Sequence, residues 1–88
     1  MELKGRVALI TGAAQGIGEG IARRIISEGG RVAGVDIQGE GLSSLEREFG
    51  ESFLGIKADL SREAEVERIF GESVSRFGGI DILVNCAV

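Results

Sequence analysis

The chain has 88 residues, of which 43% are hydrophobic and 27% charged, so we expect one small domain built around a single core. Its net charge of −4 would repel a phosphate backbone, and no apolar run approaches the ~20 residues of a membrane span, which argues against nucleic acid and membranes as partners. A single Cys86 cannot form an internal disulfide and the first residues lack a signal-peptide pattern, so the expected compartment is the cytoplasm.

Several residue types that commonly carry chemistry are absent. The sequence contains no His, no Tyr and no Trp, so acid/base catalysis lacks its commonest side chains. No group of carboxylates has the spacing of a calcium loop or a zinc site. We therefore expect no catalytic residue and no metal site within these 88 positions.

The first third of the chain predicts a strand, a glycine-rich turn and a helix. Residues 6–11 form a short apolar run that suits a strand covered on both faces. Apolar residues then recur at helical spacing until two glycines provide a stop: Ile17, Ile21, Ala22, Ile25 and Ile26, followed by Gly29 and Gly30.

The same pattern repeats twice and ends with a strand. Residues 31–37 predict a second strand, and the helix that follows carries Leu42, Leu45 and Phe49 on one side and ends at Gly50. Residues 52–59 predict a third strand. The third helix has Ser61 as its expected cap, the stripe Val66, Ile69, Phe70, Val74 and Phe77, and a stop at residues 78–79. Residues 80–87 predict the fourth strand.

Strands that alternate with helices through short connections indicate right-handed crossovers and a parallel sheet. We therefore predict an α/β fold of three layers, in which three helices cover a parallel sheet of four strands in the order 3-2-1-4. Neither a linker nor a change of composition divides the chain, so residues 1–88 are expected to form one domain.

Three glycines, Gly12, Gly16 and Gly18, lie where the first strand gives way to the first helix. The unpaired N–H groups and the dipole of a helix N-terminus favour an anion at this place. Gly12 would permit the sharp exit from the strand, Gly16 would let the main chain approach a pyrophosphate, and Gly18 would let helix pack on strand. No Lys or Arg occurs between residues 11 and 18, which argues against a P-loop. An ordinary tight turn remains the alternative.

Asp36 strengthens the dinucleotide interpretation. It ends the second predicted strand 18 residues after Gly18, where a carboxylate accepts hydrogen bonds from the adenosine ribose. A solvated aspartate at a strand end is the alternative. The same carboxylate would repel a ribose 2′-phosphate, and Ala13, Ala14 and Ile37 offer no cation to hold one. The sequence therefore predicts NAD as the cofactor in preference to NADP.

The segment "TGAAQGIG" (residues 11–18) resembles the TGxxxGxG fingerprint of the short-chain dehydrogenase/reductase family, and "ADL" (58–60) and "LVNCA" (83–87) agree with it. The resemblance implies a Rossmann-like fold. It implies that Asp59 binds the adenine amino group beside the Leu60 main chain, and that Asn85 and Ala87 belong to the family's Asn-Asn-Ala-Gly motif near the adenosine. Cys86 and Val88 depart from that motif. The predicted cofactor-binding set is Gly12, Gln15, Gly16, Ile17, Gly18, Asp36, Ile37, Asp59, Leu60, Asn85 and Ala87.

The resemblance also implies a limit on function. The family's catalytic Ser and Tyr-x-x-x-Lys follow the fourth strand, so we expect this chain to be the truncated N-terminal, dinucleotide-binding portion of an NAD(H)-dependent alcohol or carbonyl oxidoreductase, inactive by itself. The alternative is a stand-alone, non-catalytic nucleotide-binding or assembly module. Cys86 is interpreted as a small buried hydrophobe rather than a nucleophile.

The fourth strand would lie at an edge of the sheet. Its apolar edge carries no Pro or Lys to prevent pairing, and crossover handedness leaves a single helix on one face of the sheet. The sequence therefore predicts a homo-oligomer that buries the fourth strand or the under-covered sheet face.

Overall fold

A computed structural model describes residues 3–86. The strands are β1 (Val7–Thr11), β2 (Arg31–Asp36), β3 (Phe53–Lys57) and β4 (Ile82–Asn85). The helices are α1 (Gly16–Ser27), α2 (Gly39–Phe49) and α3 (Glu63–Phe77), with a 3-10 turn, η1 (Gly50–Ser52), between α2 and β3. Each strand is followed by a helix until β4, as the alternating pattern predicted.

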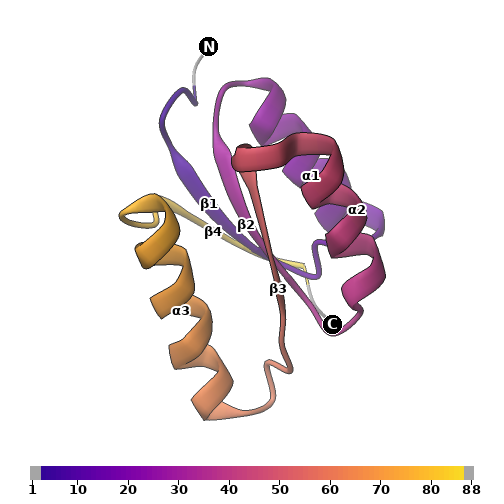
Figure 1. The fold of residues 1–88 in the computed structure, drawn as a ribbon, viewed down its shortest axis with the longest axis vertical. Helices are drawn as coiled ribbons and strands as arrows, with labels where there is room; N and C mark the ends of the chain where they lie inside the picture. Colours follow the sequence, from indigo (N-terminus) through magenta and orange to yellow (C-terminus); the bar gives the residue numbers. More distant parts are fainter. Residues whose placement is uncertain (1–2, 87–88) are drawn as a thin grey trace.

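The four strands form one parallel sheet in the order β3-β2-β1-β4, which confirms the predicted fold class. Right-handed crossovers determine which face of the sheet each helix covers. The chain moves from β1 to β2 to β3 in one direction, and α1 and α2 cover the same face; it then returns past β1 to β4, and α3 covers the opposite face (Figure 1).

The core has two layers because successive side chains of a strand point to opposite faces of the sheet. Ala8 and Ile10 of β1 pack toward α1 and α2, whereas Leu9 packs toward α3. The layer under α1 and α2 is the larger one; its buried members are Ala8, Ile10, Ala13, Ala22, Ile25, Val32, Leu42, Leu45 and Phe53. The layer under α3 contains Leu9, Ala33, Val35, Ile56, Ala58 and Ile69.

Glycines end two of the helices as expected, but the predicted helix cap is wrong. Gly50 and Gly78 follow α2 and α3 with φ values of 57° and 86°, a conformation that glycine adopts at little cost. At the start of α3 the capping position is Arg62, and its side chain makes no capping hydrogen bond. The hydroxyl of Ser61 donates instead to Asp59 Oδ1 at 2.8 Å, so it closes the turn before the helix.

The fourth strand is shorter than predicted. A carboxylate oxygen of Asp81 accepts the Val7 N–H at 2.9 Å, so a side chain takes the position that a strand carbonyl would occupy. The paired residues of β4 run from Ile82 to Asn85, and the flanking Asp81 and Cys86 N–H groups donate to the Val7 and Thr11 carbonyls. Across residues 3–86, no helix combines the length and the apolar composition that crossing a membrane would require.

The apolar stripe of α3 is only partly covered. Ile69 is buried, but Phe70 and Val74 are 41% and 48% exposed, and Leu83 of neighbouring β4 is 62% exposed. Ile17 of α1 is also outside the core, at 77% exposed. Within residues 3–86, α3 alone lies on this side of the sheet (Figure 1). Part of the apolar surface of α3 and β4 therefore stays exposed.

Candidate functional site

The connections that follow β1, β2 and β3 surround a hollow of about 640 Å³ at the carboxyl ends of these strands, here called the carboxyl-edge hollow. In open parallel sheets ligands bind at this edge, because the loops converge there and the helices begin there. Its lining residues are Gly12, Gln15, Gly16, Ile17, Gly18, Val35, Asp36, Ile37, Gln38, Ala58, Asp59, Leu60, Ser61 and Cys86.

The three glycines after β1 have distinct structural roles. Gly12 leaves the strand with φ of 72°, and its N–H donates to the Val35 carbonyl at 2.7 Å. A Cβ on Gly18 would overlap the Gly12 carbonyl, so only glycine lets α1 begin this close to β1. Gly16 has φ of 61°, and a Cβ there would project into open space. The main chain at Gly16 is therefore accessible from the hollow.

The first turn of α1 faces the carboxyl-edge hollow with uncapped backbone. Gln15 occupies the capping position and its side chain makes no capping hydrogen bond. The first N–H groups of a helix have no partner within the helix, and the helix dipole adds partial positive charge. This turn can therefore bind an anion through its amides, and the accessible main chain at Gly16 fits a phosphate better than a bulky side chain would allow.

Asp36 ends β2 and lines the hollow, and its carboxylate accepts hydrogen bonds from two backbone segments. One oxygen accepts the Ala14 N–H at 2.9 Å, and the other accepts the Gln38 N–H at 3.0 Å. Each carboxylate oxygen has a second lone pair, so hydroxyl groups of a ligand can still donate to it. Asp36 is thus placed to bind a diol while it contacts the glycine-rich turn.

Asp59 follows β3 and is engaged in a tight turn. The backbone N–H and the hydroxyl of Ser61 both donate to Asp59 Oδ1, at 3.0 and 2.8 Å. These two hydrogen bonds lower the pKa of Asp59 below its ordinary value, with the backbone bond as the larger cause. The aspartate is therefore ionised at neutral pH and lies beside Leu60 in the lining of the hollow.

The electrostatics of the hollow follow from its lining. Two carboxylates, those of Asp36 and Asp59, lie along it, and none of its described lining residues is a Lys or Arg. Phosphate oxygens would therefore be bound by amides and the helix dipole alone. The same lining disfavours an additional phosphate group beside Asp36, because like charges repel.

The hollow gathers most, but not all, of the residues predicted from the sequence. Nine of the eleven predicted residues line it: Gly12, Gln15, Gly16, Ile17, Gly18, Asp36, Ile37, Asp59 and Leu60. Asn85 does not. Its side-chain oxygen accepts the Thr11 hydroxyl at 2.7 Å, and it lines a smaller hollow of about 240 Å³ between β4 and α3. Ala87 lies outside the described residues.

The sequence missed one element of this site, the residue after β4. Cys86 was expected to be buried, but it is half-buried and lines the hollow. Its backbone N–H donates to both the carbonyl and the hydroxyl of Thr11, at 3.1 and 3.2 Å. The pairing of β4 with β1 brings these two positions together across 75 residues, and no local pattern signals it.

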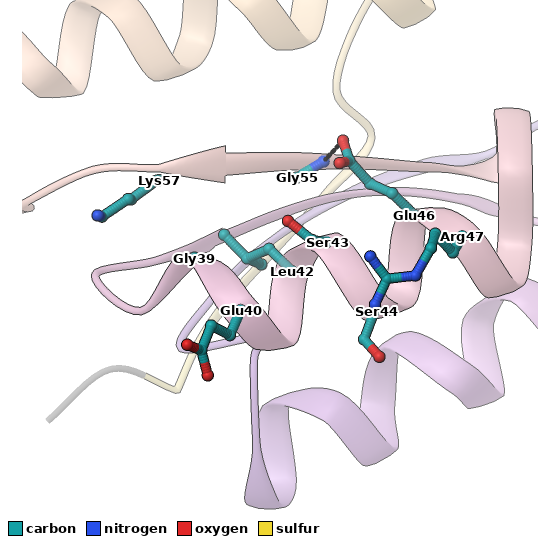
Figure 2. Close-up of a pocket in the computed structure, with 9 residues that line it drawn as sticks. All are labelled: Gly39, Glu40, Leu42, Ser43, Ser44, Glu46, Arg47, Gly55 and Lys57. Atoms are coloured by element: carbon teal, nitrogen blue, oxygen red, sulfur yellow. Dashed lines mark hydrogen bonds between the residues drawn. The ribbon is translucent and has the colours of Figure 1, made fainter.

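A larger hollow of about 750 Å³ lies on the outer side of α2, against the edge strand β3. Figure 2 shows side chains of both charges along it, with Glu40 and Lys57 near one end and Glu46 and Arg47 near the other. Glu46 accepts the Gly55 N–H at 2.9 Å, so the carboxylate is engaged with the strand edge. This hollow lies along the outer edge of the sheet, whereas the carboxyl-edge hollow contains the glycine-rich turn and the carboxyl ends of three strands.

The protein is thus a parallel α/β fold with a hollow at the carboxyl ends of its first three strands, where open sheets of this kind bind ligands. Residues 6–88 match the model of the short chain dehydrogenase family. The chain belongs to this family, as the sequence motifs had indicated.

Individual relatives agree with this assignment. The chain is 42% identical over 87 residues to a sorbitol dehydrogenase of Cereibacter sphaeroides, an alignment that covers 99% of this chain and 34% of the relative. It is similar to a 3-ketoacyl-(acyl-carrier-protein) reductase from Brucella melitensis complexed with NADH, with 42% identity and a TM-score of 0.88 over 91% of this chain and 33% of that one. The glucose dehydrogenase of Caenorhabditis elegans superposes with a TM-score of 0.93 at 28% identity, over 100% of this chain and 40% of that one. The chain thus spans about a third of the length of the proteins that it matches.

Proposed function

We propose that residues 1–88 form a single NAD-binding domain, and that the chain provides the dinucleotide-binding portion of an NAD(H)-dependent short-chain dehydrogenase/reductase. When bound, the nicotinamide supplies the hydride chemistry of alcohol and carbonyl oxidoreduction. The residues of this chain bind and orient the adenosine diphosphate part of the cofactor. The observation that carries the proposal is that the glycine-rich, uncapped start of α1 and the Asp36 carboxylate line the same hollow.

Each part of the dinucleotide has a matching group in the hollow. The pyrophosphate would lie against the amides at Gly16 to Gly18, and the adenosine ribose hydroxyls would donate to Asp36. The adenine would lie between exposed Ile37 and the segment of Asp59 and Leu60. Two carboxylates without a lining cation favour NAD over NADP, because NADP would place a phosphate beside Asp36.

Titration calorimetry with NAD, NADP and ADP-ribose tests this proposal. We expect NAD and ADP-ribose to bind and NADP to bind at least about tenfold more weakly, which corresponds to ~1.4 kcal/mol. Equal affinity for NAD and NADP would contradict the cofactor preference. A wild-type chain that binds none of the three ligands would contradict the function itself.

A pair of glycine substitutions separates binding from folding. Gly16→Ala and Gly50→Ala place a methyl group at similar φ values, 61° and 57°, with no atom within 4 Å of either Cβ. Both variants should lose stability from backbone strain, about 1–2 kcal/mol for a side chain at positive φ and more at Gly50, whose ψ of −126° lies outside the left-handed helical region. Only Gly16→Ala should also weaken NAD binding, because Gly50 lies far from the hollow in η1.

The proposal also includes the absence of catalysis by this chain alone and its cellular location. The 88 residues contain no Tyr, so purified chain alone should reduce no carbonyl with NADH, and the family's acid/base group would have to come from additional polypeptide. NAD binding without turnover is expected both for a portion of an oxidoreductase and for a stand-alone module. Reading the encoding DNA beyond Val88 distinguishes these two hypotheses. The cytoplasm is the proposed location.

The exposed apolar surface supports a proposed homo-oligomer. Phe70, Val74 and Leu83 expose side chains on the face that α3 covers, next to the edge of β4. A second copy that packs against this surface would remove it from water. Sedimentation at micromolar concentration tests the assembly, and a monodisperse monomer would contradict it.

A further inference from the structure

We propose that Asp36 is a positioning residue for the glycine-rich turn, so that its substitution weakens phosphate binding as well as ribose recognition. This inference rests on the proposed function, because the turn is the proposed pyrophosphate site. Ribose recognition alone would require only that the carboxylate face the ligand. The hydrogen bonds of Asp36 to two backbone amides indicate a second role, which is to hold loops of the protein in place.

The turn after β1 is held by the end of β2 through three successive amides. The N–H groups of Gly12 and Ala13 both donate to the Val35 carbonyl, at 2.7 and 3.1 Å. The next N–H, that of Ala14, donates to the Asp36 carboxylate at 2.9 Å. Residues 12–14 therefore depend on residues 35–36 for their conformation, and the last of these three bonds is made by a side chain.

The bond to Ala14 is of a strong kind, because its acceptor is a carboxylate and the pair is partly buried. The other carboxylate oxygen accepts the Gln38 N–H, which fixes the carboxylate with respect to its own loop. Asp36 therefore cannot turn away from Ala14 without losing two hydrogen bonds. One side chain connects the loop before α1 with the loop before α2.

Helix α2 supports the turn from another direction. A Cβ on Gly41 would come within 2.6 Å of the Ala14 carbonyl oxygen and 2.9 Å of the Ala14 Cβ. Ala14 is thus held between the Asp36 carboxylate and the first turn of α2. Immediately after Ala14 the chain reaches Gln15 and the uncapped start of α1, so the position of Ala14 determines where the phosphate-binding amides point.

The proposal makes a prediction that ribose recognition does not. A ligand without ribose hydroxyls, 2′,3′-dideoxy-ADP, retains the diphosphate but cannot donate to Asp36. If Asp36 positions the turn, Asp36→Asn and Asp36→Ala should weaken binding of this ligand about tenfold or more. Unchanged affinity for 2′,3′-dideoxy-ADP in both variants would overturn the proposal.

Asp81→Asn is the matched control. Asp81 also accepts a distant strand amide, that of Val7 at 2.9 Å, but it lies at the amino end of β4, away from the hollow. This control should lower stability as the Asp36 variants do, while folded protein keeps its affinity for 2′,3′-dideoxy-ADP. An equal loss of affinity in Asp81→Asn would identify a general folding defect and overturn the specific role of Asp36.

Amide hydrogen exchange tests the positioning without any ligand. The Ala14 N–H should exchange about ten- to a hundredfold faster in Asp36→Asn than in the wild type, and unchanged exchange would overturn the proposal. If the wild-type chain binds no nucleotide, the proposed function fails and this measurement still decides the role of Asp36.

If the Asp36 variants do not fold, a substitution at Gly41 tests the same proposal. Gly41→Ala displaces Ala14 from the other side and should weaken 2′,3′-dideoxy-ADP binding, while Gly71→Ala, where a Cβ meets no atom within 4 Å, should not. Unaltered binding in Gly41→Ala would overturn the proposal.

Discussion

The two sides of the sheet differ in how completely they are covered. On the side of α1 and α2, two helices enclose a core that includes Phe53, which is 1% exposed. On the side of α3, Ile69 is equally buried, but Phe70 and Leu83 remain 41% and 62% exposed. The difference follows from crossover handedness, since three crossovers in this strand order place two helices on one face and one on the other.

The two edge strands, β3 and β4, also differ in how far side chains cover their backbone. At β3, Glu46 accepts the Gly55 N–H and Arg68 donates to the Lys57 carbonyl at 2.8 Å, so neighbouring helices occupy backbone groups of the edge. Among residues 3–86, no side chain is hydrogen-bonded to the backbone of residues 82–84 in β4. A strand edge with open backbone groups and apolar side chains is a template for further polypeptide. The β4 side is therefore where the proposed homo-oligomer would assemble.

The largest expected effect is on the free energy of unfolding and compares the two layers of the core. Phe53→Ala should lower the free energy of unfolding by about 3–5 kcal/mol, because its ring is packed so closely that a Cβ on Gly34 would overlap it. Ile69→Ala should cost nearer to ~2 kcal/mol, since a hollow already lies beside it and less packing is lost. Denaturant unfolding measures both. A greater cost for Ile69→Ala would contradict the view that the α3 side is loosely packed.

The next effect concerns assembly. Leu83→Glu places a charge on the exposed apolar surface of β4 and should raise the dissociation constant of the homo-oligomer at least about tenfold, or ~1.4 kcal/mol. Sedimentation equilibrium is the measurement. Ser44→Glu adds the same charge on exposed α2 and should leave the assembly unchanged. If both variants assemble like the wild type, β4 is not part of the interface.

A smaller effect is expected at the protected edge. Glu46→Ala removes the acceptor of the Gly55 N–H and should lower the free energy of unfolding by about 0.5–1.5 kcal/mol. Glu51→Ala removes an exposed carboxylate for which no hydrogen bond or ion pair is seen, and it should change stability less. Thermal or denaturant unfolding compares the two. Equal stability of both variants would show that Glu46 does not stabilise the edge of β3.

The smallest effect concerns pH. The pKa of Asp59 is lowered from its ordinary 3.8 by the backbone N–H and the hydroxyl of Ser61, so the ionised form favours the folded state. The contribution is complete above pH 3.8 and is lost as pH falls through the lower pKa of the folded state. Ser61→Ala should move this pKa upward without fully restoring 3.8, because the backbone bond remains. Carboxyl NMR titration measures the shift, with Ser75→Ala as control; an unmoved pKa would contradict the role of the hydroxyl.

Local patterns in the sequence determined the order and type of the elements. Apolar runs of four to eight residues became strands, and Gly50 and Gly78 ended helices where they were expected to. The glycine spacing identified the first turn, because backbone geometry at Gly12 and Gly18 depends on immediate neighbours and on one close contact. These properties involve short segments, so the sequence contains them directly.

Only the tertiary structure decided which groups meet across long stretches of chain. The carboxylate of Asp36 reaches Ala14 across 22 residues, and Asn85 meets Thr11 rather than the carboxyl-edge hollow. Ser61 was predicted as a helix cap from its position alone, yet α3 begins with Arg62 at the capping position, and the Ser61 hydroxyl donates to the nearby Asp59 carboxylate instead. Periodicity likewise marked Phe70 as apolar but could not show that it is exposed. The sequence predicted the strand order and the under-covered face, but the packing of α3 on the sheet decides which side chains of its stripe stay exposed.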